Sequence, residues 1–295
     1  MNIERVAGIT SAVGEGPIWD NSTNDLWFID IVACRITRLE SNGRSASWAT
    51  PGRVGAIAAF GDGRVAVALE SSFRIFDPAV GEFGPATHVD LGEGSVVCEG
   101  KVDRQGRFVV MTSDSAFTDP IGEILRWEPD GSIARLATGY VLGNSLCWSV
   151  DGTTMYAADS IARVIHSYAY DPQPSSGLGR CNEFAAFAGS DPFPDGAVID
   201  SEGHMLVVMH RSPHIARINP EGVIVDRITM PTPNITSLTF GGPDLDVLYV
   251  TSLDPTQVPV PPDAAALAAE RGLLYRVTGT GLRGVPDSPV RVEPA

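Results

Sequence analysis

Apolar and polar residues alternate along this chain in short runs separated by polar turns, a pattern typical of β-strands. A small residue opens a β-rich run, a polar turn with Asp or Gly follows, and a second apolar run comes next. In the first copy these runs are Gly16–Asp20 and Leu26–Asp30. The pattern starts again at five further positions, namely Ala56, Gly100, Ser145, Gly196 and Ser237. The sequence therefore contains six copies of one unit.

Each copy continues into a third alternating run, and most copies into a weaker fourth. The third runs are Arg35–Leu39, Phe73–Phe76, Ile124–Trp127, Val164–Tyr168, Ile215–Ile218 and Leu273–Val277. Equivalent positions in the copies are 40 to 51 residues apart. This spacing predicts an all-β fold, a six-bladed β-propeller with four antiparallel strands per blade. We expect residues 1–295 to form this single domain, with a helical insertion at 264–270 in the last blade.

The composition limits the classes of partner that the protein can bind. The formal net charge of −15 argues against nucleic acid, because phosphate binding needs a basic face. No stretch resembles a signal peptide or a membrane span, so we expect no membrane partner. The four cysteines are scattered without a CxxC pair, which indicates reduced thiols and a cytoplasmic location. A neutral small molecule or a cation is the expected partner, and the sequence does not indicate an oligomeric state.

The first strand of each blade lines the channel of a propeller, so equivalent residues of the six copies face one another there. The residues just before the small opening residue are Glu15, Gly55, Glu99, Asn144, Asp195 and Thr236. Three carboxylates brought together repel one another unless a cation lies between them. The sequence thus predicts one divalent metal ion, with Ca²⁺ favoured and Mg²⁺, Mn²⁺ or Zn²⁺ as alternatives. The competing interpretation is that each polar residue only caps a strand or a turn.

Several motifs resemble the gluconolactonase, senescence marker protein (regucalcin) and luciferin-regenerating enzyme family. They are GEGPIW at 14–19, NSLCW at 144–148, PDG at 194–196, FGGPD at 240–244 and LYVT at 248–251. The resemblance extends from about Glu15 to Val277. It implies a six-bladed propeller, metal ligation by Glu15, Asn144 and Asp195, and Asp195 as general base.

The third blade departs from the family pattern. Sugar lactonases of this family usually carry Arg-x-Asn-Asp-Gly-Lys there, with Arg and Asn on the substrate hydroxyls. This chain has VVCEGK at 96–101, so Val96 replaces the Arg, Cys98 the Asn and Glu99 the Asp. The departure implies a substrate that is not a standard aldonolactone, or one that is held differently.

These observations predict a metal-dependent lactonase, with the ion polarising the carbonyl and Asp195 activating water. Asp195 is alternatively a ligand only, and Glu99 a fourth ligand, a substrate contact or an acceptor behind the ligands. Lys101 and Arg53 are candidate substrate contacts or members of structural ion pairs. His210 is the one histidine placed to approach the channel mouth. Two other functions remain open: phosphotriester or fluorophosphate hydrolysis at the same metal site, and a non-catalytic calcium- or ligand-binding propeller.

Overall fold

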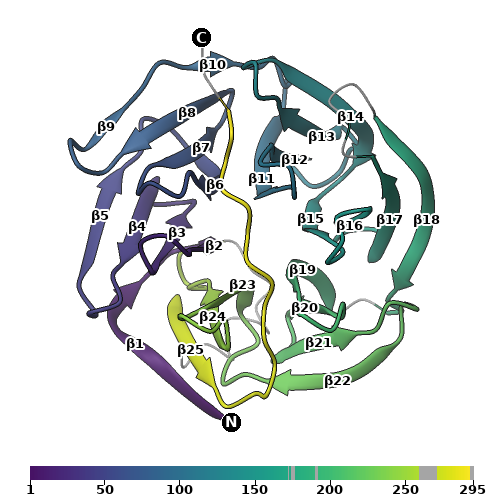
Figure 1. Cartoon of the computed structure of the whole chain (residues 1–295). Coiled ribbons are helices and arrows are strands. Elements are labelled where there is room, and N and C mark those ends of the chain that lie inside the picture. The colour runs from purple at the N-terminus through teal and green to yellow at the C-terminus, as the bar shows by residue number, and fades with distance from the viewer. Residues whose placement is uncertain (172, 174–176, 190–191, 259–270, 293–295) are drawn as a thin grey trace.

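The structure is a computed structural model that describes residues 1–171, 173, 177–189, 192–258 and 271–292. Its strands form six antiparallel sheets arranged around a central axis (Figure 1). The predicted six-bladed propeller is confirmed, and the described residues contain no helix. The helical insertion expected at 264–270 lies outside the described residues.

Each blade has its first strand at the axis and its last strand at the rim. The first blade consists of β2 (Gly14–Asp20), β3 (Asp25–Asp30), β4 (Arg35–Leu39) and β5 (Ser45–Ala49). The second consists of β6 (Val54–Ala59), β7 (Val65–Leu69), β8 (Ser72–Asp77) and two short outer strands, β9 (Glu82–Phe83) and β10 (Thr87–His88). The third consists of β11 (Ser95–Val102), β12 (Phe108–Asp114), β13 (Gly122–Trp127) and β14 (Ile133–Tyr140).

The remaining blades repeat the arrangement. The fourth consists of β15 (Gly143–Trp148), β16 (Thr154–Asp159), β17 (Val164–Tyr170) and β18 (Leu178–Ala186). The fifth consists of β19 (Phe193–Ile199), β20 (Met205–His210), β21 (His214–Ile218) and β22 (Ile224–Thr229). The sixth consists of β23 (Ile235–Gly241), β24 (Val247–Ser252), β25 (Leu273–Thr278) and β1 (Asn2–Thr10).

The N-terminal strand closes the ring. β1 pairs antiparallel with β25, with Ile3 opposite Val277 and Arg5 opposite Tyr275. The last blade is therefore assembled from both ends of the described chain, as Figure 1 shows for the purple and yellow strands. This pairing covers the edge of β25 and leaves β1 as the outer strand of the blade.

A register irregularity recurs in the inner strand of every blade. The shifts lie between the pairs Glu15/Ile18, Val54/Ala56, Val97/Glu99, Asn144/Cys147, Pro194/Ala197 and Ile235/Leu238. A bulge of this kind inserts an extra residue and re-aims the neighbouring side chains. The shifts fall at or beside the six repeat positions that the sequence predicts to face the axis, so the bulges set the direction of those side chains.

Small residues let the inner strands pack closely. A methyl group on Gly55 would lie 2.3 Å from the carbonyl oxygen of Val97, and one on Gly196 would lie 2.1 Å from Oγ of Ser237. Further along these strands, large aromatic side chains fill the space between blades. Trp19, Trp148 and Phe240 occupy one repeat position and are buried there. Burying each contributes on the order of 2–3 kcal/mol.

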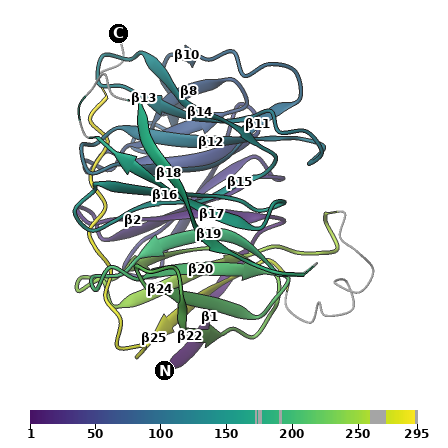
Figure 2. The same cartoon turned by 90° about the vertical axis from the view of Figure 1, so that its right-hand side faces the viewer.

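The C-terminal segment crosses one end of the channel (yellow in Figure 1). Ser201 N donates to Arg283 O at 2.8 Å in the fifth blade, and Val290 N donates to Ala59 O at 2.8 Å in the second. In the side view of Figure 2 this segment runs along a single face of the disc. It covers the ends of the inner strands, whereas the predicted site residues lie at their beginnings. None of the described residues forms a helix able to cross a membrane.

Candidate metal centre at the channel mouth

The four predicted ligands lie on the inner strands of four blades. Glu15 lies on β2, Glu99 on β11, Asn144 on β15 and Asp195 on β19. All four side chains are buried, with exposed fractions of 9%, 3%, 7% and 8%. A buried carboxylate is stable only with a partner or a proton, so these side chains must be either paired or protonated.

Each of the three carboxylates accepts a hydrogen bond from the backbone N–H of the next residue. Gly16 N donates to Glu15 Oε2 at 2.9 Å, and Gly100 N donates to Glu99 Oε1 at 2.9 Å. The backbone of Gly196 likewise lowers the pKa of Asp195 through a hydrogen bond. The bulge thus brings the next amide N–H onto each carboxylate, which orients one oxygen and leaves the other for a different partner.

Electrostatics bring these carboxylates into one group. Burial raises the pKa of Glu15 well above its usual value, and the charges of Asp195 and Glu99 raise it further. Burial and then the charge of Glu99 raise the pKa of Asp195 in the same way. The pKa of Glu99 is raised by burial, while Lys101 opposes that rise. The charges of these three carboxylates therefore act on one another, whereas their convergence on one ion stays a prediction.

Asn144 is held by a short chain of hydrogen bonds. Its Nδ2 donates to Ser160 Oγ at 2.9 Å, and that hydroxyl donates to Pro194 O at 2.6 Å. Ser145 Oγ donates to Asp195 O at 2.5 Å, which ties the fourth and fifth blades together. With Nδ2 used in this way, the amide oxygen of Asn144 is the atom available to a cation. Ser145 follows a repeat position, whereas nothing in the sequence marks Ser160.

His210, at the end of β20, lies beside Asp195. The distance from His210 Nδ1 to Asp195 Oδ2 is 3.6 Å, and Nδ1 is 2.9 Å from Ile235 O. The imidazole packs against Phe193, with the ring centroids 5.0 Å apart. The expectation that this histidine approaches the mouth is consistent with these contacts. Since Nδ1 donates to the Ile235 carbonyl, the ring orientation beside Asp195 is fixed.

The two predicted cationic contacts both bond backbone carbonyls of neighbouring blades. Lys101 Nζ donates to Ala197 O on β19, and its charge lowers the pKa of Glu15 and of Glu99. Arg53 Nη1 donates to Val97 O at 2.6 Å, and burial lowers the pKa of this guanidinium. Within the described ranges, neither cation forms the carboxylate ion pair considered from the sequence.

The two cysteines near the predicted ligands, Cys98 and Cys147, are unreactive. Cys98 Sγ accepts from Ser113 Oγ at 2.7 Å and donates to Gly143 O at 2.9 Å. Burial raises the pKa of Cys98 and of Cys147 to about 12. Both thiols therefore stay protonated and poorly nucleophilic at neutral pH. Cys147 is fully buried, as expected for a packing residue, whereas Cys98 is half-buried.

A second group of acidic residues and a histidine has closely spaced ligand atoms, but an arginine already neutralises its charge. Asp200, Glu202 and His204 have ligand atoms within 4.8 Å of one another, a spacing that among the described residues only this group shows. Arg217 occupies it, at 2.7 Å from Asp200 Oδ2 and 2.6 Å from Glu202 Oε2. This cluster follows β19, at the far end of that strand from Asp195. We interpret it as a structural ion-pair network.

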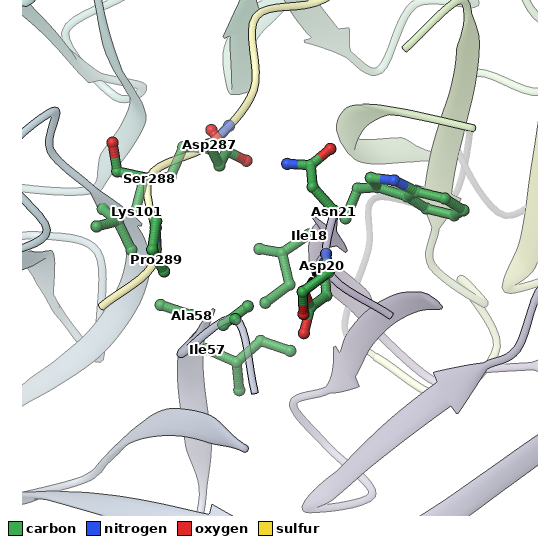
Figure 3. A pocket seen from close by; sticks show the side chains of 14 residues that line it. Ile18, Asp20, Asn21, Ile57, Ala58, Lys101, Asp287, Ser288 and Pro289 are labelled. Atoms are coloured by element: carbon green, nitrogen blue, oxygen red, sulfur yellow. Dashed lines mark hydrogen bonds between the residues drawn. The ribbon is translucent and has the colours of Figure 1, made fainter. Parts of the chain in front are cut away.

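A cavity lies at the far end of the channel. It has a volume of about 190 Å³ and lies between the inner strands and the C-terminal segment (Figure 3). Ile18, Ile57 and Ala58 form its apolar wall, and Lys101 and Asp287 line its other side. Lys101 therefore lies between the carboxylates on one side and this cavity on the other.

A six-bladed propeller with buried carboxylates on its inner strands defines the class of protein. Within this class, the model of the SMP-30/gluconolactonase/LRE-like region matches residues 13–254, and the chain belongs to that family. The resemblance noted in the sequence is thereby confirmed.

Individual relatives match over most of their length. Regucalcin from Danio rerio is 28% identical over 290 residues, covering 97% of each chain. The 6-deoxy-6-sulfogluconolactonase of Pseudomonas putida is 31% identical over 246 residues, covering 82% of this chain and 84% of the relative. The structure of luciferin-regenerating enzyme superimposes with a TM-score of 0.89 at 28% identity, covering 99% of each chain.

Proposed function

We propose that the protein is a lactonase that depends on one divalent metal ion held by Glu15, Glu99, Asn144 and Asp195. The observation that carries this proposal is the group of three buried carboxylates with raised pKa values, in which the charge of Glu99 raises the pKa of both Glu15 and Asp195. Such a group is unfavourable in the metal-free fold, and a cation between the carboxylates removes the repulsion. Carboxylate and amide oxygens suit Ca²⁺ best, with Mg²⁺ and Mn²⁺ as further candidates and Zn²⁺ less suited.

The reaction divides between the ion and the protein. When bound, the ion supplies Lewis acidity toward the carbonyl oxygen of the lactone. Asp195 accepts the proton of the attacking water as general base. His210 and the Ser145 hydroxyl support this role, because they contact the side chain and the carbonyl of Asp195 respectively. The positive charge of Lys101 offsets part of the negative charge of Glu15 and Glu99.

A lactone is the substrate class that the relatives favour, since the Pseudomonas relative is named as a sulfogluconolactonase. The third blade of this chain modifies that expectation. Val96 and Cys98 stand where the family pattern has Arg and Asn, and the Cys98 thiol is engaged by Ser113 and Gly143. We therefore propose a lactone that is not gripped by the usual third-blade pair.

An assay panel of lactones, aryl esters and organophosphates, run with each of the four cations, tests the proposal. The expected result is lactone hydrolysis that chelation abolishes and one cation restores. Turnover of organophosphates in place of lactones would identify a phosphotriesterase. Tight metal binding without any turnover would identify a binding protein. Full activity in protein shown to be metal-free would refute the metal-dependent mechanism.

A further inference from the structure

Arg53 reaches across a blade boundary at the channel mouth. It directly precedes β6 of the second blade, and its Nη1 donates to the carbonyl of Val97 on β11 of the third blade at 2.6 Å. Its own backbone N–H points to Glu70 Oε1 at 3.4 Å. The main chain is thus held in the second blade while the guanidinium lies over the inner strand of the third.

The contact with Val97 locates this guanidinium relative to the carboxylates. Val97 lies two residues before Glu99 on β11, and the register shift of that strand falls between these two residues. Arg53 therefore lies at the edge of the same site, on the side of β11.

Arg53 retains hydrogen-bonding capacity there. A guanidinium has five N–H donors in a planar fork, and Val97 O takes one of them. No carboxylate in the described ranges forms an ion pair with it. The divalent ion, the three carboxylates and the cations Lys101 and Arg53 sum to one positive charge, which the exposed carboxylate of Glu70 beside Arg53 offsets in part. A half-buried guanidinium in such a setting suits an oxyanion, which accepts two parallel hydrogen bonds from the fork.

We propose that Arg53 binds an oxyanion substituent of the substrate, so that the preferred lactone carries a carboxylate, sulfonate or phosphate group beside its ring. This inference rests on the proposed lactonase function. In the family pattern the substrate-binding Arg lies on the third blade, where this chain has Val96. The inference places a substrate-binding cation on the second blade instead. Arg53 is thus a specificity residue and takes no part in bond cleavage.

The test compares two ligand pairs that differ by one charge. The first pair is 5-oxotetrahydrofuran-2-carboxylate and its carboxamide, assayed for hydrolysis with calcium-loaded protein. The second pair is their ring-opened products, 2-hydroxyglutarate and its C1 carboxamide, measured by calorimetric titration. In Arg53→Met we expect kcat/KM for the carboxylate lactone and affinity for 2-hydroxyglutarate to fall about 10- to 100-fold, the range for a charge-assisted hydrogen-bonded pair. Values for both carboxamides should change less than about threefold.

Two controls separate recognition from structure and from overall charge. Arg35→Met removes one exposed positive charge from the same face of the protein and should affect neither pair. Arg53→Lys should recover part of the preference, since it restores the charge without the planar fork. Equal losses for the carboxylate and the carboxamide of each pair in Arg53→Met, or none for either, would overturn the inference. Charge-dependent binding without hydrolysis of any lactone would uphold the role of Arg53 and refute the lactonase proposal.

Discussion

Replacing Glu15 with Gln should change stability in opposite directions with and without metal. In metal-free protein the variant removes one of three buried carboxylates that repel one another. A buried charged group without full compensation costs about 1–3 kcal/mol, so Glu15→Gln should stabilise the metal-free fold by about that amount. For a chain of this size this corresponds to an increase in Tm of about 2–5 °C. Gln keeps the size of the side chain, which limits any packing effect.

The stabilisation of the metal-free fold by Glu15→Gln should increase with pH. The pKa of Glu15 in the folded protein is raised above its value of about 4.3 in the unfolded chain. The folded state therefore prefers the protonated carboxyl. The stability associated with that proton is fully present below pH 4 and is lost as pH rises through the folded pKa. Metal-free wild type and Glu15→Gln should thus have similar stability near pH 4 and diverge toward pH 8.

Calcium should reverse the comparison. The variant lacks one charged ligand, so its affinity for Ca²⁺ should fall at least about tenfold, and saturating metal should raise its Tm less than that of wild type. Scanning fluorimetry across pH, with and without chelator, measures both effects. Glu93→Gln, an exposed carboxylate on the same face, is the matched control and should change stability by less than about 0.5 kcal/mol. A metal-free Glu15→Gln protein that is less stable than wild type at pH 8 would refute the proposed repulsion.

Three further outcomes are expected. Asp195→Asn should retain metal, by calorimetry, while turnover falls about 10²- to 10⁴-fold, and recovery of activity in excess metal would instead make Asp195 a ligand only. The double variant Val96→Arg with Cys98→Asn should improve kcat/KM for gluconolactone by about 1–3 kcal/mol, and a wild type that already prefers gluconolactone would contradict this. Asp103→Asn should destabilise the fold by about 3–5 kcal/mol in urea unfolding, because it leaves Arg107, 2.6 Å away and equally buried, without its counter-charge; a loss below about 1 kcal/mol would show that this pair is not needed.

The blades were predictable because each repeats the same local signals. Alternation of apolar residues and a turn at every break specify strands whatever the rest of the chain does. For β4 the predicted run, Arg35–Leu39, coincides with the observed strand. The repeat also predicts that Glu15, Glu99, Asn144 and Asp195 lie at the same height, since equivalent residues of a propeller lie at equivalent heights on the axis.

Features that depend on contacts between distant segments were not predictable. β1 closes the ring through pairing with β25, yet its own burial pattern has no regular alternation. The segment that crosses the far end is held by single hydrogen bonds such as Arg291 N to Gly106 O at 2.7 Å, which leave no periodic signal in the sequence. Ser160 orients Asn144 from the next loop, and no repeat position marks it.

The two remaining axial positions show what structure alone requires at this height of the channel. Gly55 is small because its neighbour Val97 leaves no space for a side chain. Thr236 Oγ1 donates to Gly14 O at 2.5 Å and lies 2.9 Å from Thr251 Oγ1, so a neutral hydroxyl satisfies the strand junction there. Packing and hydrogen bonding therefore account for these residues without any charge. With Asn144 counted, the same position is uncharged in three blades, so stability does not explain the buried carboxylates with raised pKa values in the other three. Groups that break a local rule in this way are expected at functional sites, and the cation that we propose here would make these three favourable.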